Sequence, residues 1–333
     1  MTRRIILPLL LLCLVLTGSP SVVQADPAIR DKPFIQLKTP NIKRLQGIQG
    51  VVWVPEQRVF YSTWNRRNGD GSERINVVRH DATGNVIDYS ETVGPGSSSR
   101  YSLGHGQSID YLFINGIFTL VTDSGDSRGA TFFEMSGSGK GWKLANVRVY
   151  TLQPSEVKSG TVALSVDKTK LIKTGGPYKK GKNVRIWPVA ALTAGPQGDR
   201  TGDGTPYLEI IQPNLGLPNQ GIALDGNQLK FLNGNNLVAG QQSVTDFDIM
   251  SKSVIKSSNL GAGVQRLRSS EGNVPQIGEP EGMFTIRGMD GRPAYWMGIS
   301  RKDCSGGGYD TFVVPLAEGF QGSDLPDKCS IKK

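Results

Sequence analysis

The sequence has 333 residues, of which 42 are glycine and 19 are proline, and its formal net charge is +9. No run of five or more basic residues occurs, so composition does not favour a nucleic-acid partner. A moderate positive charge favours polyanionic partners, although it would also serve plain solubility. The length is ordinary for a single large β architecture.

An apolar run near the N-terminus, Ile5–Leu16, follows two arginines and precedes the small-residue segment Val23-Gln24-Ala25. This order is typical of a cleavable secretory signal peptide, which we predict over residues 1–25. The alternative is a membrane anchor, but the run has about 12 residues and a span needs roughly 20. No second long apolar run follows, so we expect a secreted or periplasmic protein with no integral membrane segment after cleavage.

Signal cleavage removes Cys13 and leaves Cys304 and Cys329. A pair of cysteines in an oxidising compartment is most simply a disulfide. Cleavage also removes two arginines, so the net charge falls from +9 to about +7.

Short runs rich in branched and aromatic residues, bounded by Gly, Asn, Asp, Ser or Pro, dominate the remaining chain. Long apolar helical faces are scarce. The sequence therefore predicts an all-β protein with little helix. The clearest strand predictions are 51–54, 59–63, 111–114, 117–122, 131–135, 184–188 and 312–315.

A weak repeat recurs along the chain: a polar residue, a glycine, and then an alternating hairpin. Its units are about 60 residues long, and each has room for four strands, which is typical of a β-propeller blade. We predict a five-bladed β-propeller over residues 45–333, with about four antiparallel strands per blade, preceded by an N-terminal arm over residues 26–44. A glycine-rich sandwich or a two-domain β protein is the alternative. The repeated glycines are Gly47, Gly106, Gly160, Gly221 and Gly282.

The residue before each repeated glycine is polar, and the innermost strands of a propeller line its central channel. These residues would form a ring at the channel mouth, where they could bind a ligand. Alternatively, these residues form hydrogen bonds with neighbouring backbone, stabilise the closed propeller and bind no ligand. The predicted ligand-binding set consists of Gln46, His105, Gln107, Gln220, Glu279 and Glu281, with Ser159 as the weaker third member of the ring.

Two of these residues, His105 and Glu281, are the candidates for acid–base catalysis if the protein is an enzyme. Glu279 and Glu281 are two apart and would share a strand face, so they could also bind a cation. The alternative is one structural and one solvated glutamate. The second histidine, His80, precedes a turn and is expected at the surface.

The third repeat is strongly basic, and Lys179, Lys180, Lys182 and Arg185 are the candidates for contact with a polyanion. A solvated lysine-rich loop is the alternative. The segment 199–204 faintly resembles a calcium loop but lacks the acid at position 12, so we expect a polar loop. No metal or cofactor is expected.

The motifs His-Gly-Gln-Ser from His105, Gln-Gly-Ile-Ala-Leu-Asp-Gly from Gln220 and Glu-Pro-Glu-Gly-Met from Glu279 resemble a family of five-bladed propellers. The family includes helveticin J bacteriocins, proteins of the teichoic-acid-associated protein C type, and receptor-binding domains of some podovirus tails. The resemblance implies binding of cell-wall glycopolymers or killing of related bacteria. Ser159 departs from the pattern, as do the predicted signal peptide and cysteine pair, which suggest an exported relative with its own target.

We therefore expect a monomeric, secreted propeller that binds an anionic cell-surface glycopolymer or polysaccharide, with a helveticin-like antibacterial role as an extension. A propeller hydrolase or lyase acting on sugars or phosphodiesters, with His105 and Glu281 as acid and base, is the first alternative. A protein-binding scaffold is the second.

Overall fold

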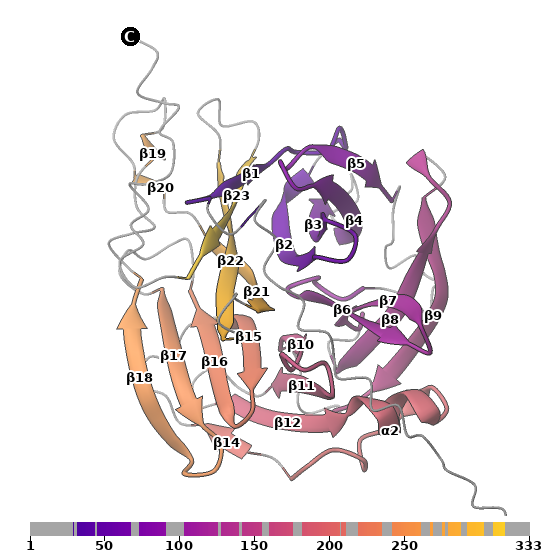
Figure 1. Ribbon diagram of the computed structural model, residues 1–333, viewed down its shortest axis with the longest axis vertical. Helices are drawn as coiled ribbons and strands as arrows, with labels where there is room; N and C mark the ends of the chain where they lie inside the picture. Colours follow the sequence, from indigo (N-terminus) through magenta and orange to yellow (C-terminus); the bar gives the residue numbers. More distant parts are fainter. Residues whose placement is uncertain are drawn as a thin grey trace, which may run out of the picture.

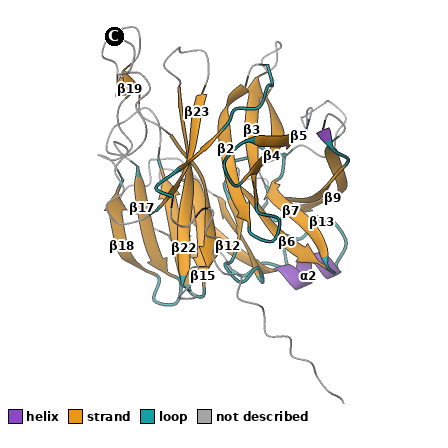
Figure 2. Ribbon diagram, turned by 45° about the horizontal axis from the view of Figure 1, so that its top comes forward, coloured by secondary structure: helices purple, strands orange, loops and turns teal. Residues whose placement is uncertain are grey.

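In the computed structural model, five small β-sheets are arranged around a central axis as a five-bladed β-propeller (Figure 1). Strands dominate and the short helix α2 (Val189–Ala194) lies at one end of the molecule (Figure 2). The predicted fold class and blade count are confirmed. The structure describes residues 29, 32–43, 45–67, 73–90, 103–125, 128–139, 142–154, 160–175, 182–206, 208–210, 219–234, 242–260, 267–268, 275–276, 279–287, 292–302 and 309–316.

The first three blades follow one another along the chain, and within each the strands run in sequence order from the axis outward. A fifth strand, β13, joins blade 2 parallel to β9. The strands are β2 (Leu45–Val54), β3 (Val59–Arg67), β4 (Glu73–Asp81) and β5 (Val86–Tyr89) in blade 1; β6 (Ile109–Ile114), β7 (Ile117–Asp123), β8 (Gly129–Ser136), β9 (Lys143–Thr151) and β13 (Gly198–Asp199) in blade 2; and β10 (Val162–Leu164), β11 (Lys170–Gly175), β12 (Lys182–Pro188) and β14 (Leu208–Ile210) in blade 3.

Blade 4 repeats this order, whereas blade 5 takes its outermost strand, β1, from the N-terminal part of the chain. A two-stranded sheet, β19 (Leu267–Arg268) with β20 (Pro275–Gln276), lies between them in sequence. The strands are β15 (Asn219–Asp225), β16 (Gln228–Asn233), β17 (Ser243–Asp248) and β18 (Ser253–Asn259) in blade 4, and β21 (Glu279–Arg287), β22 (Pro293–Lys302), β23 (Tyr309–Pro315) and β1 (Ile35–Leu37) in blade 5.

Local turn chemistry explains the hairpins. Asn115 and Gly116 both adopt left-handed backbone conformations, with φ of 51° and 79°, as a tight two-residue hairpin requires. The Asp81 carboxylate accepts hydrogen bonds from the backbone amides of Thr83 and Asn85, both at 2.9 Å, and so fixes the turn between β4 and β5.

The five inner strands form a closed ring in which each contacts the next. Three of the contacts require glycine: a Cβ on Gly282 would lie 2.8 Å from Gly50 Cα, one on Gly221 would lie 2.7 Å from Met283 Cβ, and one on Gly50 would lie 2.9 Å from the backbone carbonyl carbon of Ser108. Contacts between neighbouring inner strands show that the five blades follow one another around the axis in sequence order. These contacts join Gly50 to Ser108, Ser108 to Val162, Thr161 to Asn219, Gly221 to Met283 and Gly282 to Gly50.

The propeller closes through strand β1, which pairs antiparallel with β23, with Ile35 opposite Val313 and Leu37 opposite Thr311. Part of the segment expected to be an N-terminal arm is therefore the fourth strand of blade 5. Because β1 covers the outer edge of β23, a strand edge that would otherwise be open is paired.

The core lies between facing blades. Between blades 1 and 5, Phe60 contacts Trp53 and Phe284, with ring centroids 4.6 and 6.4 Å apart, and Phe284 stacks with Trp296 at 6.4 Å. No helix in the described ranges has the length and apolar character needed to cross a membrane.

The prediction that His80 lies at the surface was wrong: its side chain is fully buried. Its Nε2 lies 3.1 Å from the carbonyl oxygen of Lys38, just beyond β1, and its Nδ1 lies 3.4 Å from Ser62 Oγ. The turn after His80 is exposed, but His80 itself points inward to the joint between blade 1 and the N-terminal segment.

Candidate functional site at the channel mouth

Each repeated glycine lies within the first four residues of an inner strand or just before it, at the end of the propeller that we call the mouth end. Of the predicted ring residues, the structure describes the side chains of His105, Gln107, Gln220 and Glu281. Gln46 and Glu279 belong to β2 and β21, but their side chains lie outside the described set, as does the whole of Ser159.

Two predicted ligand-binding amides meet at the mouth. Gln107 Nε2 lies 3.5 Å from Gln220 Oε1, and Gln220 Nε2 lies 3.4 Å from the carbonyl oxygen of Gly234. Gln107 belongs to blade 2 and Gln220 to blade 4, so their contact reaches past the start of blade 3. Gln220 is buried, whereas Gln107 is partly exposed and so accessible to a ligand.

His105 has an exposed side chain on a tight loop that a buried carboxylate holds in place. Asp123 Oδ2 accepts a hydrogen bond from the His105 backbone amide at 3.0 Å. The loop passes so close that a Cβ on Gly104, whose φ is +56°, would lie 2.2 Å from the same oxygen. Burial raises the pKa of Asp123, while the nearby Lys173 ammonium and the hydrogen bond from His105 oppose that rise.

The start of blade 3 is held by a network of buried polar groups. Lys173 is fully buried and its Nζ donates to the carbonyl oxygen of Gly160 at 2.8 Å. Thr174 Oγ1 accepts from the Thr161 amide at 2.8 Å, and Thr161 Oγ1 donates to Asn219 Oδ1 at 2.7 Å. The first two bonds lie within blade 3, and the bond from Thr161 to Asn219 links it to the inner strand of blade 4.

Glu281 is 4% exposed and lies on β21, one residue before the glycine that packs against Gly50. Of the predicted ring residues, Glu281 is therefore buried, whereas His105 is exposed.

Sequence reasoning missed a second set of polar residues, where the strand that follows each inner strand returns to the mouth. These side chains are all buried, and each lies level with the start of the neighbouring inner strand. The available signal was a polar residue at or within three residues of the end of the second strand in every repeat. The set consists of Asn65, Asp123, Lys173, Asn233 and Ser300.

The predicted polyanion contacts in blade 3 are only partly described. Lys179 and Lys180 lie outside the described residues, and Lys182 begins β12 with no described side chain. Arg185 is only 7% exposed, and its guanidinium donates to the carbonyl oxygens of Thr205, Thr201 and Gly204 at 2.8, 2.8 and 3.1 Å. Arg185 thus holds the segment after α2 against β12.

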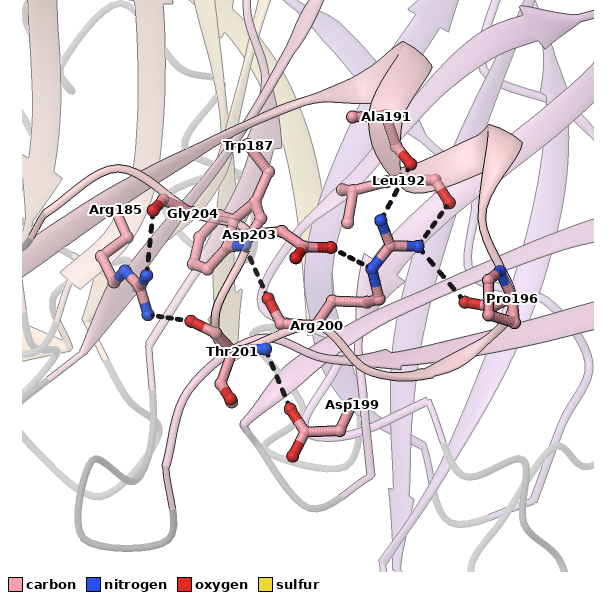
Figure 3. A network of polar contacts seen from close by, with 10 residues as sticks. All are labelled: Arg185, Trp187, Ala191, Leu192, Pro196, Asp199, Arg200, Thr201, Asp203 and Gly204. Atoms are coloured by element: carbon pink, nitrogen blue, oxygen red, sulfur yellow. Dashed lines mark hydrogen bonds and ion pairs between the residues drawn. The ribbon is translucent and has the colours of Figure 1, made fainter.

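Figure 3 shows how this segment is fixed. Arg200 pairs with Asp203 and donates to the carbonyl oxygen of Ala191, within α2, at 3.0 Å. The Asp199 carboxylate accepts from the Thr201 amide at 2.9 Å. The faintly calcium-like segment is a self-bonded loop, and no cluster of His, Cys, Asp or Glu that could hold a metal occurs within the described part of the chain. The predicted Cys304–Cys329 pair lies outside that part.

An aromatic cluster lies at the opposite end of the propeller, between blades 1 and 2. Phe113, beside the β6–β7 turn, is 48% exposed, and its ring lies 5.7 Å from Phe118 and 6.3 Å from Tyr111. Phe118 in turn lies 5.3 Å from Tyr61, which stacks with Trp142. This cluster provides a reference surface away from the mouth.

No protein-family model matches the chain, and no curated protein matches it. Among solved structures, the tail fiber of Staphylococcus aureus phage P68 is similar over 86% of this chain and 53% of that one, with a TM-score of 0.58 and 18% identity. The chain thus spans about half the length of the tail fibre. A hypothetical protein from Leishmania major matches with a TM-score of 0.46 and 11% identity, over 87% of this chain and 92% of that one. A mannose phosphorylase from Leishmania mexicana matches with a TM-score of 0.45 and 12% identity, over 86% of this chain and 88% of that one. At these identities, what the chain shares with the tail fibre is the fold.

Proposed function

We propose that the chain is an exported receptor-binding propeller that recognises an anionic cell-surface glycopolymer of bacteria at its channel mouth. The observation that carries the proposal is the contact between Gln107 and Gln220 at 3.5 Å. Side-chain amides each supply two donors and an acceptor, so they match the mixed donor and acceptor character of sugar hydroxyls. A ligand can replace this long contact with better hydrogen bonds of its own.

The surroundings of the two amides support a polar ligand. His105 is exposed two residues from Gln107, and the buried Glu281 would add a carboxylate deeper in the proposed site. The backbone that carries these groups is rigid, because the Asp123 carboxylate fixes the His105 loop and neighbouring inner strands touch at Gly50 and Gly282. A preorganised site loses less entropy when a ligand binds.

The class of ligand rests on charge and on the structural neighbour. The formal net charge of +9, or about +7 after the predicted signal cleavage, attracts polyanions at long range. A tail fibre of a Staphylococcus phage shares the fold, and the proposal extends a surface-binding role from that class of protein to this chain. Export requires the predicted signal peptide over residues 1–25, and the helveticin-like antibacterial role would be an extension of binding at the target surface.

The test is calorimetric binding of the purified protein to bacterial wall glycopolymer. We expect Gln107→Ala and His105→Ala each to weaken binding by about tenfold, because each removes hydrogen bonds to the ligand. Phe113→Ala, on the aromatic cluster at the opposite end, is the matched control and should bind like the wild type. Equal binding by all four proteins would contradict the proposal.

The same incubation discriminates the enzyme alternative. Released sugar or phosphate products that disappear in His105→Ala would show that His105 takes part in catalysis and would replace the binding role by a hydrolase or lyase. Binding without products supports the proposal as stated.

A further inference from the structure

Two arginines oppose each other on blade 1 at the mouth end. Arg66 of β3 and Arg74 of β4 are register partners, so their side chains share one face of the sheet. Like charges directly opposite in an antiparallel pair repel each other. The Nε atoms of both are buried and make no hydrogen bond to any described residue. An anion bound between the two guanidinium groups would offset their repulsion and accept hydrogen bonds from the buried N–H groups.

The face that carries the two arginines is turned toward blade 5. Phe60 lies on the same face of β3 as Arg66, six residues away, and its ring contacts Phe284 of blade 5 at 6.4 Å. His80 lies on the same face of β4 as Arg74, and its Nε2 approaches the Lys38 carbonyl beyond β1 at 3.1 Å. Both strands therefore direct the arginines into the interface between blades 1 and 5, which adjoin in Figure 1.

Blade 5 presents two buried hydroxyl groups to the same interface. Ser300 of β22 and Thr311 of β23 are register partners that are 7% and 0% exposed. The Oγ of Ser300 and the Oγ1 of Thr311 have no hydrogen-bond partner among the described residues. Ser300 lies two residues beyond Gly298, where an added Cβ would lie 3.3 Å from Val51 Cγ1 of blade 1, so its side chain faces blade 1.

The arginines and the hydroxyls lie at matching heights along the interface. Gly50 and Gly282 mark a common level where the two blades touch. Arg66 lies three residues toward the mouth from Thr63, the register partner of Gly50. Ser300 lies two residues toward the mouth from Gly298, the register partner of Glu281.

A fifth buried atom indicates which anion would fit. Asn76, two residues from Arg74 on the same face, is fully buried, and its Oδ1 has no donor, while its Nδ2 bonds the Ser90 carbonyl oxygen at 2.5 Å. Hydrogen phosphate carries both acceptor oxygens for the arginines and hydroxyls and an O–H donor for Asn76. A carboxylate ion carries acceptors alone.

We propose that Arg66, Arg74, Ser300 and Thr311 form a phosphate-binding site between blades 1 and 5, separate from the amides at the channel mouth. Guanidinium groups bind phosphate through paired, charge-assisted N–H···O bonds, and buried hydroxyl groups supply further donors. The site accepts either inorganic phosphate or a phosphate monoester carried by a larger molecule. This inference goes beyond the proposed function and does not depend on it.

The test is thermal unfolding and calorimetry with inorganic phosphate, against chloride at the same ionic strength and pH. A ligand that binds only the folded state raises the unfolding midpoint. We expect phosphate to raise the midpoint of the wild type, and Arg66→Gln and Arg74→Gln each to weaken phosphate binding by about tenfold. Arg148→Gln, which removes a like charge from β9, is the matched control and should keep the full effect.

The unfolding midpoint in chloride, compared between each variant and the wild type, shows whether a variant is destabilised in the absence of phosphate. Because each glutamine removes a repelling charge, Arg66→Gln and Arg74→Gln should unfold in chloride no lower than the wild type. Ser300→Ala should also weaken phosphate binding. The proposal would be overturned if phosphate had no effect on the wild type, or if both arginine variants bound phosphate as tightly as the wild type does.

The source of the phosphate group is resolved by two further arms. Inorganic phosphate and a sugar phosphate monoester are titrated separately, and tighter binding of the monoester assigns the site to a larger phosphorylated ligand. Tighter binding of inorganic phosphate assigns it to the free ion. If the protein bound phosphate but did not bind wall glycopolymer, the proposed function would be contradicted and the phosphate site would be supported.

Discussion

At the scale of single residues, His80 shows how a buried titratable group ties the N-terminal segment to blade 1. Burial lowers its pKa to about 4, which outweighs the opposing hydrogen bond to the Lys38 carbonyl and the charge of Asp81. The neutral ring is therefore the form that the fold requires at neutral pH.

This residue predicts a specific pH dependence of stability. The unfolded chain, with an ordinary histidine pKa near 6.5, binds more protons than the folded chain between pH 6.5 and pH 4, so stability is full above pH 6.5 and falls as the pH drops toward 4. The loss from this one group is about 3 kcal/mol. Urea unfolding at a series of pH values should show this loss in the wild type and a flatter profile in His80→Gln. Profiles of equal slope in the two proteins would contradict the assignment.

Sequence reasoning at this scale reached the residues that lead into each inner strand but not their supports. The repeated-glycine pattern identified Gln107, just after Gly106, and Gln220, just before Gly221, and their side chains meet in the structure. It missed Asp123 and Lys173, because a buried charged residue in a strand looks like a surface residue until the facing strand is known. Arg185 shows the reverse error, since a basic residue in a lysine-rich stretch proves to be bonded to three backbone carbonyls.

At the scale of elements, strands and turns were predicted well where periodicity and turn residues agree. The hairpin at Asn115-Gly116 and the strands that flank it match their predictions closely. Helix α2 and the Arg200 loop after it were not predicted, because six residues are too few for a helical pattern. Strand β1 was also missed, since its three residues pair with a strand almost 280 positions away.

Closure through β1 makes a testable claim about stability. Leu37 is 1% exposed in β1 and belongs to the core shared by blades 1 and 5. We expect Leu37→Ala to lower the free energy of unfolding by about 3 kcal/mol, through lost burial and the cavity left behind. Ile117→Ala, at a side chain that is 52% exposed, should change it by less than about 0.5 kcal/mol. Chemical denaturation of the two variants checks the claim, and equal stabilities would mean that β1 contributes little to closure.

At the scale of the whole molecule, the repeat of about 60 residues specified the number of blades, because each hairpin must bury both faces against neighbours. What the repeat could not show is that the ring closes with a strand from the other end of the chain, or that two arginines of blade 1 face two hydroxyls of blade 5. Both features depend on contacts between the first and last blades, which are far apart in the sequence. A local sequence pattern therefore cannot predict them.

The whole molecule has two distinguishable ends, which allows its central claim to be tested by location. The mouth end carries Gln107 and Gln220, and the opposite end carries the aromatic cluster around Phe113. The most direct measurement is hydrogen–deuterium exchange of backbone amides with and without purified wall glycopolymer. The account predicts slower exchange at residues 103–108 and 219–221 and no change at residues 113–118. Protection confined to residues 113–118, or no protection anywhere, would contradict binding at the channel mouth.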